Sequence, residues 1–223
     1  MTQILLDIGA YKGDWSNRAA LLLSREKISG YVHAFEPSSS TFAYLSERFK
    51  GSDLVSTNKI ALSDQSGERE FFVVGEMVGT DSLLRIDGAT VEHVPTLRLD
   101  DFLAEKRIDH VLFAKSDTEG HDLSVLHGAV KILRQGRVDV WQFEYNHRWI
   151  DGRSCLKEVF DFIADKPYQL GKLYGDGIEI YDSWHPELER FFESNYVLIL
   201  KGSRFEILCT RVFFNYRNVL IPG

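Results

Sequence analysis

The sequence predicts an α/β fold in which helices cover a parallel β-sheet, and two observations lead to that prediction. The first is an apolar run over residues 4–8, ILLDI, interrupted only by Asp7. Such a run is typical of a strand buried on both faces of a parallel sheet. The second is the alternation of further apolar runs with segments of helical periodicity. Units of this kind connect parallel strands by right-handed crossovers.

A tight turn and a helix follow the first strand. Residues 9–12 join it to a helical segment that begins near Gly13. Gly9 lets the backbone come close to a ligand, and the start of the helix offers free N–H groups. The apolar face of the helix is predicted to contain Trp15, Ala19, Leu22 and Leu23.

An acid at the end of a buried strand, directly before such a turn, is the layout of a nucleotide-like cofactor site. Gly9 and Gly13 do not meet the G-x-G-x-x-G pattern that holds a pyrophosphate at a helix start. Asp7 would also repel a pyrophosphate, whereas it suits a ligand with an amino group. S-adenosylmethionine, which carries an ammonium and a sulfonium group, is such a ligand.

The second predicted strand, within residues 31–37, ends at Glu36. A carboxylate at this place can accept hydrogen bonds from the two hydroxyl groups of a ribose. A solvated glutamate at a strand end is the alternative, although Pro37 and the serines after it are typical of a turn that starts a helix. That helix is predicted over residues 41–49.

Five segments, in this order, resemble the FkbM family of S-adenosylmethionine-dependent methyltransferases: LDIGAYKGDWS, HAFEPSSSTFAYL, NKIALSDQSGE, TLRLDDFL and FAKSDTEGHDLSVLHGA. The resemblance implies a class I methyltransferase (Rossmann-like) fold, doubly wound, whose mostly parallel seven-stranded sheet has an antiparallel pair at one edge. It also implies S-adenosylmethionine as cofactor. The implied reaction is O-methylation of a sugar, a polyketide or a related small molecule.

The third strand is predicted over residues 54–62. In the implied fold its end reaches the adenine ring of the cofactor. Ala61 or Leu62 would pack on the ring, and Ser63 or Asp64 would meet its amino group. A plain turn role for Asp64 stays open.

A strand over residues 68–74 follows, inside a glycine-punctuated excursion to about residue 95. This excursion is interpreted as a mobile cover over the substrate. Asp100 is predicted to cap the helix after it, and the charges of residues 101–107 form a solvated face.

The segment over residues 111–129 concentrates ionisable groups after a short strand at residues 111–114. Alternate residues of an extended chain point the same way, so Lys115, Asp117 and Glu119 can share a face, where the lysine would keep the aspartate ionised. The family pattern resembles K-x-D-x-E-G-x-E. This chain departs from it at Asp122, which replaces a glutamate, and at His121, where relatives usually have a small residue. The departure leaves the substrate contacts open.

The strand at residues 138–145 ends beside this site, which makes His147 a second candidate base. A helix is predicted over residues 154–164, and the last strands over residues 168–173, 177–181 and 196–200. We expect one domain over residues 1–223, with its core at about residues 4–200. The apolar extension at residues 201–223 would add a strand, pack on the sheet or form a homodimer contact.

Composition limits the function. The chain has 223 residues, a formal charge of −7 and no basic cluster, which argues against a nucleic-acid substrate. Cys155 and Cys209 do not make a disulfide framework, and neither a signal segment nor a membrane-spanning run is visible. A cytoplasmic protein is the resulting expectation.

The predicted site therefore has two groups of residues. The candidate catalytic residues around the acceptor are Lys115, Asp117, Glu119, His121 and His147. The candidate cofactor-binding residues are Asp7, Gly9, Ala10, Tyr11, Gly13, Ser16, Glu36, Pro37, Ala61 and Ser63.

Several alternatives remain at this stage. Methylation of a nucleobase amine is disfavoured because residues 115–118 lack the usual Pro-Pro motif, and a nicotinamide dehydrogenase because the glycine pattern is missing. A non-catalytic module that binds S-adenosylmethionine stays open, as does a polyketide, lipid or protein acceptor. We expect no metal requirement, although Asp117, Glu119 and Asp122 offer oxygen ligands. Action beside glycosyltransferases, or fusion to them, also stays open.

Overall fold

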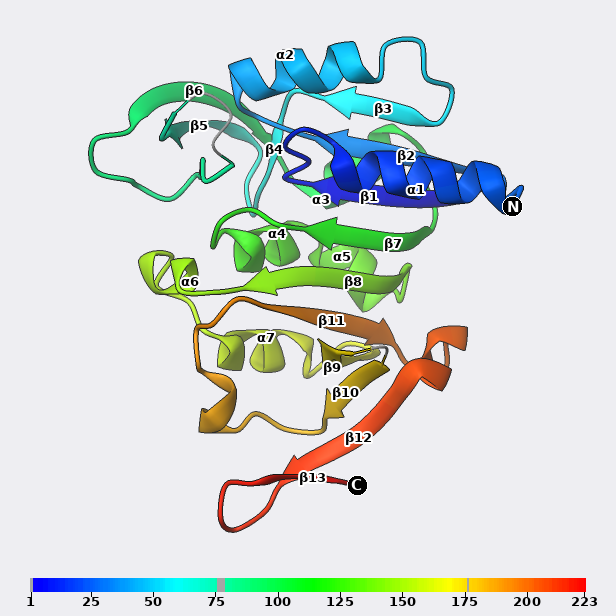
Figure 1. Ribbon diagram of the computed structural model, residues 1–223, viewed down its shortest axis with the longest axis vertical. Coiled ribbons are helices and arrows are strands. Elements are labelled where there is room, and N and C mark those ends of the chain that lie inside the picture. Colours follow the sequence, from blue (N-terminus) through cyan, green and yellow to red (C-terminus); the bar gives the residue numbers. More distant parts are fainter. Residues whose placement is uncertain (1, 76–78, 176) are drawn as a thin grey trace.

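The computed structural model describes residues 2–75, 79–175 and 177–223. In this part of the chain the largest element is a ten-stranded sheet with the order β13-β12-β10-β9-β11-β8-β7-β1-β2-β3 (Figure 1). Its strands are β1 (Gln3–Ile8), β2 (Gly30–Phe35), β3 (Val55–Asn58), β7 (Val111–Ser116), β8 (Val138–Tyr145), β9 (Tyr168–Tyr174), β10 (Gly177–Tyr181), β11 (Ser194–Leu200), β12 (Cys209–Phe214) and β13 (Leu220–Pro222).

The first half of the sheet is parallel, as predicted. Strands β3, β2, β1, β7 and β8 pair in parallel in that spatial order. The carboxyl ends of these strands therefore meet at one edge of the sheet, where ligands bind in open α/β sheets. The expected Rossmann-like α/β fold is confirmed.

The second half of the sheet differs from the prediction of seven strands with an antiparallel edge pair. Strand β11 runs antiparallel between β8 and β9, but the sheet continues beyond this point. β10 forms a hairpin with β9, β12 pairs in parallel with β10, and β13 returns along β12. The C-terminal extension, whose role was open, thus adds strands to the sheet.

A small second sheet corrects the prediction of a single strand over residues 54–62. The strand predicted over residues 54–62 ends at Asn58, and β4 (Ala61–Leu62) pairs with β6 (Thr90–Leu97) in a different, three-stranded sheet. Its third member, β5 (Gly67–Val73), is antiparallel to β6. Part of the predicted cover, residues 76–78, lies outside the described residues.

Helices cover both faces of the large sheet. On one face, α1 (Asp14–Arg25) and α2 (Ser39–Arg48) pack on alternate strand residues such as Leu5 and Val32. On the other face, Leu6 and Ile8 belong to the core under the remaining helices. These are α3 (Leu99–Glu105), α4 (Asp122–Gly128), α5 (Val130–Arg134), α6 (Arg148–Asp151) and α7 (Leu156–Ile163). Leu22, predicted on the apolar face of α1, is half-exposed instead.

Asp100 has a different role from the one predicted. It lies inside α3, and its carboxylate accepts hydrogen bonds from the N–H groups of Lys131 and Ile132 at 3.1 and 3.0 Å. Asp100 therefore caps the start of α5 rather than its own helix, because residues distant in sequence bring that helix start to it.

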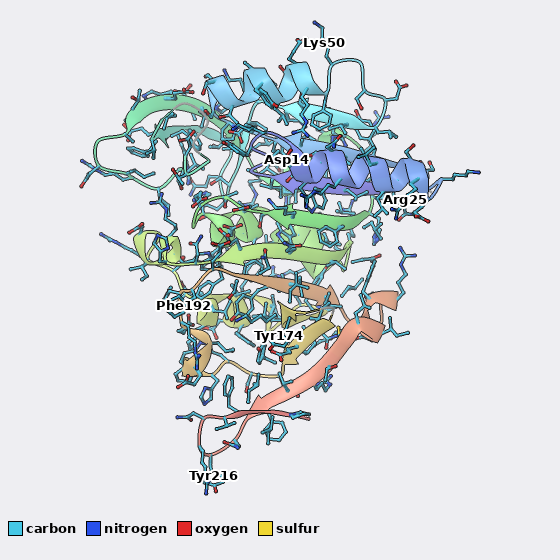
Figure 2. The ribbon with its side chains drawn as sticks, viewed as in Figure 1. Asp14, Arg25, Lys50, Tyr174, Phe192 and Tyr216 are labelled. Atoms are coloured by element: carbon cyan, nitrogen blue, oxygen red, sulfur yellow. The ribbon has the colours of Figure 1, made fainter. Side chains whose placement is uncertain are left out.

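The C-terminal part exposes several large aromatic side chains, among them Tyr174, Phe192 and Tyr216 (Figure 2). Cys155 and Cys209 are both free thiols. Among the described residues, no helix combines the length and the apolar character that crossing a membrane requires.

Candidate active site

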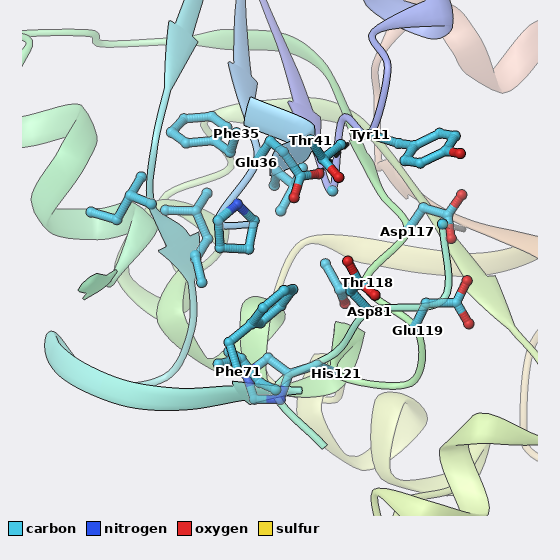
Figure 3. Close-up of a pocket in the computed structure, with 18 residues that line it drawn as sticks. Tyr11, Phe35, Glu36, Thr41, Phe71, Asp81, Asp117, Thr118, Glu119 and His121 are labelled. Carbon is cyan, nitrogen blue, oxygen red and sulfur yellow. Dashed lines mark hydrogen bonds between the residues drawn. The ribbon is translucent and has the colours of Figure 1, made fainter. Parts of the chain in front are cut away.

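A cavity opens where the carboxyl ends of β1, β2 and β7 meet, and residues of the three-stranded sheet form its other wall (Figure 3). Together with the open space at its mouth it encloses about 590 Å³. Its polar lining is Tyr11, Glu36, Thr41, Asp81, Asp117, Thr118, Glu119 and His121. Its apolar lining is Ile8, Phe35, Pro37, Ile60, Ala61, Leu62, Phe71 and Leu83.

Gly9 brings the turn after β1 against the backbone of Asp117. A side chain at Gly9 would place its Cβ 2.0 Å from the Asp117 carbonyl oxygen, and φ here is +74°. The N–H groups of Gly9 and Ala10 donate to the Phe35 carbonyl oxygen at 3.1 and 2.9 Å. Glycine is required because two backbones approach closely at this point.

Asp7 is completely buried and does not line the cavity. Its Oδ2 accepts hydrogen bonds from the N–H of Ser16 at 3.1 Å and from the Ser16 hydroxyl at 2.6 Å, so it caps the first turn of α1. Its Oδ1 lies 3.8 Å from Lys115 Nζ. Burial raises the pKa of Asp7, and the nearby lysine charge opposes that rise. Any effect of Asp7 on a ligand must therefore pass through α1 or Lys115.

Glu36 lines the cavity with a carboxylate that the backbone holds in place. One oxygen accepts a hydrogen bond from the N–H of Tyr11 at 3.0 Å, and the other from the N–H of Ser38 at 2.9 Å. Burial raises the pKa of Glu36 to about 7, and these two hydrogen bonds act against that rise. Each carboxylate oxygen can accept a further hydrogen bond, so Glu36 can still bind hydroxyl groups of a ligand.

A hydrogen-bonded chain of side chains lies at the wall that β4 and α4 share. The hydroxyl of Ser63 donates to Asp64 Oδ1 at 2.9 Å and lies 3.0 Å from His121 Nε2. Arg69 holds Asp64 with an ion pair of 2.9 Å. Of the four side chains Arg69, Asp64, Ser63 and His121, only that of His121 lines the cavity within the described residues. Burial lowers the pKa of His121 to about 4, so its imidazole is neutral at neutral pH.

Three acids form what we call the carboxylate cluster: Asp117, Glu119 and Glu144. Burial, followed by the charge of Asp117, raises the pKa of Glu119 to about 7 and that of Glu144 to about 8. Glu119 also has φ +52°, an unusual backbone conformation for a residue with a side chain. Such strain is found at functional sites, and Glu119 lines the cavity.

Two cations flank the carboxylate cluster. Lys115 Nζ lies 3.2 Å from Asp117 Oδ2, and Arg148 Nε lies 3.9 Å from Glu119 Oε2. Within the described residues, each acid of the cluster offers one oxygen, and these oxygens lie within 4.8 Å of one another. A cation could be held at this spacing, but Lys115 and Arg148 already supply positive charge. The absence of a metal requirement stays a prediction.

Apart from the buried Asp7, the predicted residues fall into three groups. Tyr11, Pro37 and Ala61 line the cavity, as do Gly9, Glu36, Asp117, Glu119 and His121. Ala10, Gly13, Ser16 and Ser63 are buried, Lys115 is partly buried, and none of these five lines the cavity. His147 is exposed, precedes α6 and does not line the cavity.

Sequence reasoning assigned no role to Glu144 or Phe71. Glu144 was expected beside the site, at the carboxyl end of the strand that pairs with β7, but only His147 was named there as a candidate base. Phe71 lies on β5 of the small sheet, within the segment that was expected to cover the substrate, but no local signal singled out this side chain.

Comparison with known proteins shows which family the sequence matches. The sequence model of the family described as "Methyltransferase FkbM domain" matches residues 7–170. No curated protein sequence matches the chain significantly.

Several solved structures are similar to this chain. The CMeT domain of the citrinin polyketide synthase is 12% identical with a TM-score of 0.48, and the match covers 89% of this chain and 46% of that one. The precorrin-6y C5,15-methyltransferase of Geobacter metallireducens is 15% identical with a TM-score of 0.41, and the match covers 88% of this chain and 78% of that one. Aeropyrum pernix fibrillarin with bound S-adenosyl-L-methionine is 12% identical with a TM-score of 0.45, and the match covers 89% of this chain and 66% of that one. The chain spans about half the length of the first of these structures.

Proposed function

Because the chain belongs to the FkbM family of methyltransferases, whose model matches residues 7–170, we propose that it methylates a hydroxyl group of a carbohydrate or a related small molecule. Membership makes it a methyltransferase with S-adenosylmethionine as cofactor. The hydroxyl group and the acceptor class are the parts that we propose.

The cavity suits this cofactor. Glu36 carries a carboxylate that two backbone N–H groups hold in place and that can accept hydrogen bonds from ribose hydroxyl groups. Gly9 lines the cavity at the turn after β1, where the methionine part would lie, and Ala61 and Phe71 provide apolar surface for the adenine ring. When bound, S-adenosylmethionine supplies a methyl carbon that its sulfonium activates for displacement.

The carboxylate cluster is the observation that carries the proposal. Methylation of a hydroxyl requires a group that orients the oxygen and removes its proton as the O–C bond forms. Glu119 lines the cavity and has a pKa of about 7, close to the value that suits a general base at neutral pH. We assign the base to Glu119, which takes the hydroxyl proton onto its carboxylate. Glu144 would hold the acceptor hydroxyl in line.

Lys115 has a supporting role in this proposal. Its ammonium group lies between the buried Asp7 and the cluster residue Asp117. It therefore fixes the direction of the Asp117 side chain by an ion pair of 3.2 Å. Asp117 would then hold the acceptor or the amino group of the cofactor.

The test uses tritium-labelled methyl transfer to a panel of glycosides, with polyketide alcohols, lipids and peptides in parallel. We expect label on a glycoside hydroxyl, and a Glu119→Gln variant that binds cofactor but transfers label roughly 10²–10⁴-fold more slowly. Transfer only to a non-sugar acceptor would overturn the acceptor class. Calorimetric binding of cofactor without transfer to any acceptor would favour a non-catalytic binding module.

A further inference from the structure

His121 occupies an unusual position for a histidine. It directly precedes α4, its side chain is buried, and it lines the cavity. Figure 3 shows it beside Phe71, whereas the carboxyl groups of Asp117 and Glu119 lie at another part of the cavity. The imidazole of His121 therefore lies next to the aromatic ring of Phe71 and away from the carboxylate cluster (Figure 3).

Counting protons fixes the tautomer of His121. The Ser63 hydroxyl has one proton, and it donates that proton to Asp64 Oδ1 at 2.9 Å. Its oxygen must therefore accept from His121 Nε2, which lies 3.0 Å away. Arg69 holds Asp64 with an ion pair of 2.9 Å, so the direction of this chain is set. A neutral imidazole that carries its proton on Nε2 has a lone pair on Nδ1.

The Nδ1 atom of His121 is open to a ligand. Among the described residues it has no hydrogen-bond partner, and it is not one of the fully enclosed unpaired atoms. Because His121 lines the cavity, its exposed part faces that space. The ring also stays neutral, since burial and the nearby Arg69 lower its pKa to about 4. The cavity therefore contains a fixed neutral acceptor.

The surfaces near this acceptor identify the ligand group. Ala61, Leu62 and Phe71 line the same cavity and offer apolar contact to a flat ring. We propose that His121 Nδ1 accepts a hydrogen bond from the 6-amino group of the adenine ring and so selects an adenosyl cofactor against its 6-oxo analogue. A 6-oxo group is an acceptor, and it would face the lone pair of Nδ1. His121 is then a specificity residue and not the base.

This inference depends on the S-adenosylmethionine cofactor and not on the proposed acceptor. Its test therefore measures binding of S-adenosylhomocysteine and S-inosylhomocysteine by calorimetry, without any acceptor. We expect the protein to prefer the adenosyl compound by about 30-fold or more, as expected when a buried polar group loses its partner. The proposed O-methylation can fail without changing this result.

Two variants of His121 complete the test. His121→Ala removes the acceptor and should reduce the preference to about threefold or less. His121→Asn places a carbonyl oxygen near the position of Nδ1 and should keep most of the preference. Equal preference in the wild-type protein and His121→Ala, with only methyl transfer lost, would overturn the inference and return His121 to the role of a base.

Nitrogen-15 NMR of the folded wild-type protein gives a second, independent readout. We expect the Nε2–H tautomer of His121 at neutral pH and a shift of the Nδ1 resonance when S-adenosylhomocysteine binds. The opposite tautomer, or an Nδ1 resonance that the ligand does not change, would contradict the proposal even if a variant failed to fold.

Discussion

The two ends of the cavity differ in how their polar groups are satisfied. At the His121 end, Arg69, Asp64, Ser63 and His121 form a chain in which each member has a partner, and within the described residues His121 Nδ1 has none. In the carboxylate cluster, by contrast, Glu119 and Glu144 are held near other acids that raise their pKa values further than burial alone. Burial shifts pKa values at both ends. At the His121 end it lowers the pKa of the imidazole to about 4, whereas in the cluster it helps to raise the pKa values of Glu119 and Glu144 to about 7 and about 8.

This difference separates binding from chemistry. A completed hydrogen-bond chain is rigid and presents one fixed acceptor, which suits recognition of a ligand. A cluster of acids with pKa values near neutrality can accept a proton during a reaction. Variants at the first end should therefore change cofactor binding, and variants at the second should change turnover.

Glu119→Gln should have the largest effect. It removes the proposed base, so we expect kcat to fall by roughly 10²–10⁴-fold. The dissociation constant for S-adenosylhomocysteine should stay within about threefold, because the change leaves the binding end intact. Steady-state methyl transfer and calorimetry measure the two quantities.

The control is Glu105→Gln, which changes an exposed acid of α3 that pairs with Lys106 on the surface. It should leave both quantities unchanged. If Glu119→Gln instead weakened cofactor binding and left kcat unchanged, the division between the two ends would be wrong.

Glu36→Ala should have the next largest effect, now on binding. The variant loses a carboxylate that would accept two hydrogen bonds from the ribose, so we expect S-adenosylhomocysteine to bind roughly 10–100-fold more weakly. Calorimetry measures this change. Glu47→Ala, at an exposed acid of α2, is the matched control. Unchanged affinity in Glu36→Ala would sink the assignment of the cofactor to this cavity.

The pH dependence of stability gives a third, smaller effect. The pKa of Glu144 rises from 4.5 to about 8, so the folded state binds a proton more tightly than the unfolded state. The free energy of unfolding should therefore decrease as the pH rises from about 4.5 to about 8.

Glu144→Gln should remove part of this decrease. We expect the variant to be more stable than the wild-type protein at pH 8 by about 1 kcal/mol, and the difference to shrink toward pH 5. Urea unfolding at both pH values measures it. A variant that is less stable than the wild-type protein at pH 8 would show that the negative charge of Glu144 is not repelled by Asp117 and Glu119 in the folded protein.

His147→Ala should have a small effect, because His147 is exposed and does not line the cavity. We expect kcat and cofactor affinity to stay within about threefold, as for most exposed positions. A loss of kcat comparable to that of Glu119→Gln would instead make His147 the base and move the chemistry away from the cluster.

Removal of metal ions should have the smallest effect. Lys115 and Arg148 flank the cluster and partly balance its charge, so we expect EDTA to leave methyl transfer unchanged. Activity that EDTA abolishes and magnesium restores would show that the cluster holds a cation.

The sequence by itself determined the parallel half of the sheet and the region of the cavity. Alternating apolar runs and helical segments predicted β1, β2, β7 and β8, because burial of a strand or of a helix face leaves a local periodic pattern. The same pattern located Glu36 and Asp117 at strand ends. It also drew attention to Asp7 and Lys115, since acids and bases are unusual near buried strands.

Only the tertiary structure decided which polar groups meet. Asp7 faces Lys115, Asp100 caps α5, and Ser63 holds His121, each across a long separation in sequence. The strand predicted over residues 54–62 divides between two sheets for a similar reason, because β4 finds its partner in the distant β6. Periodicity records how deeply a residue is buried, but a hydrogen bond depends on where two distant segments come together in space.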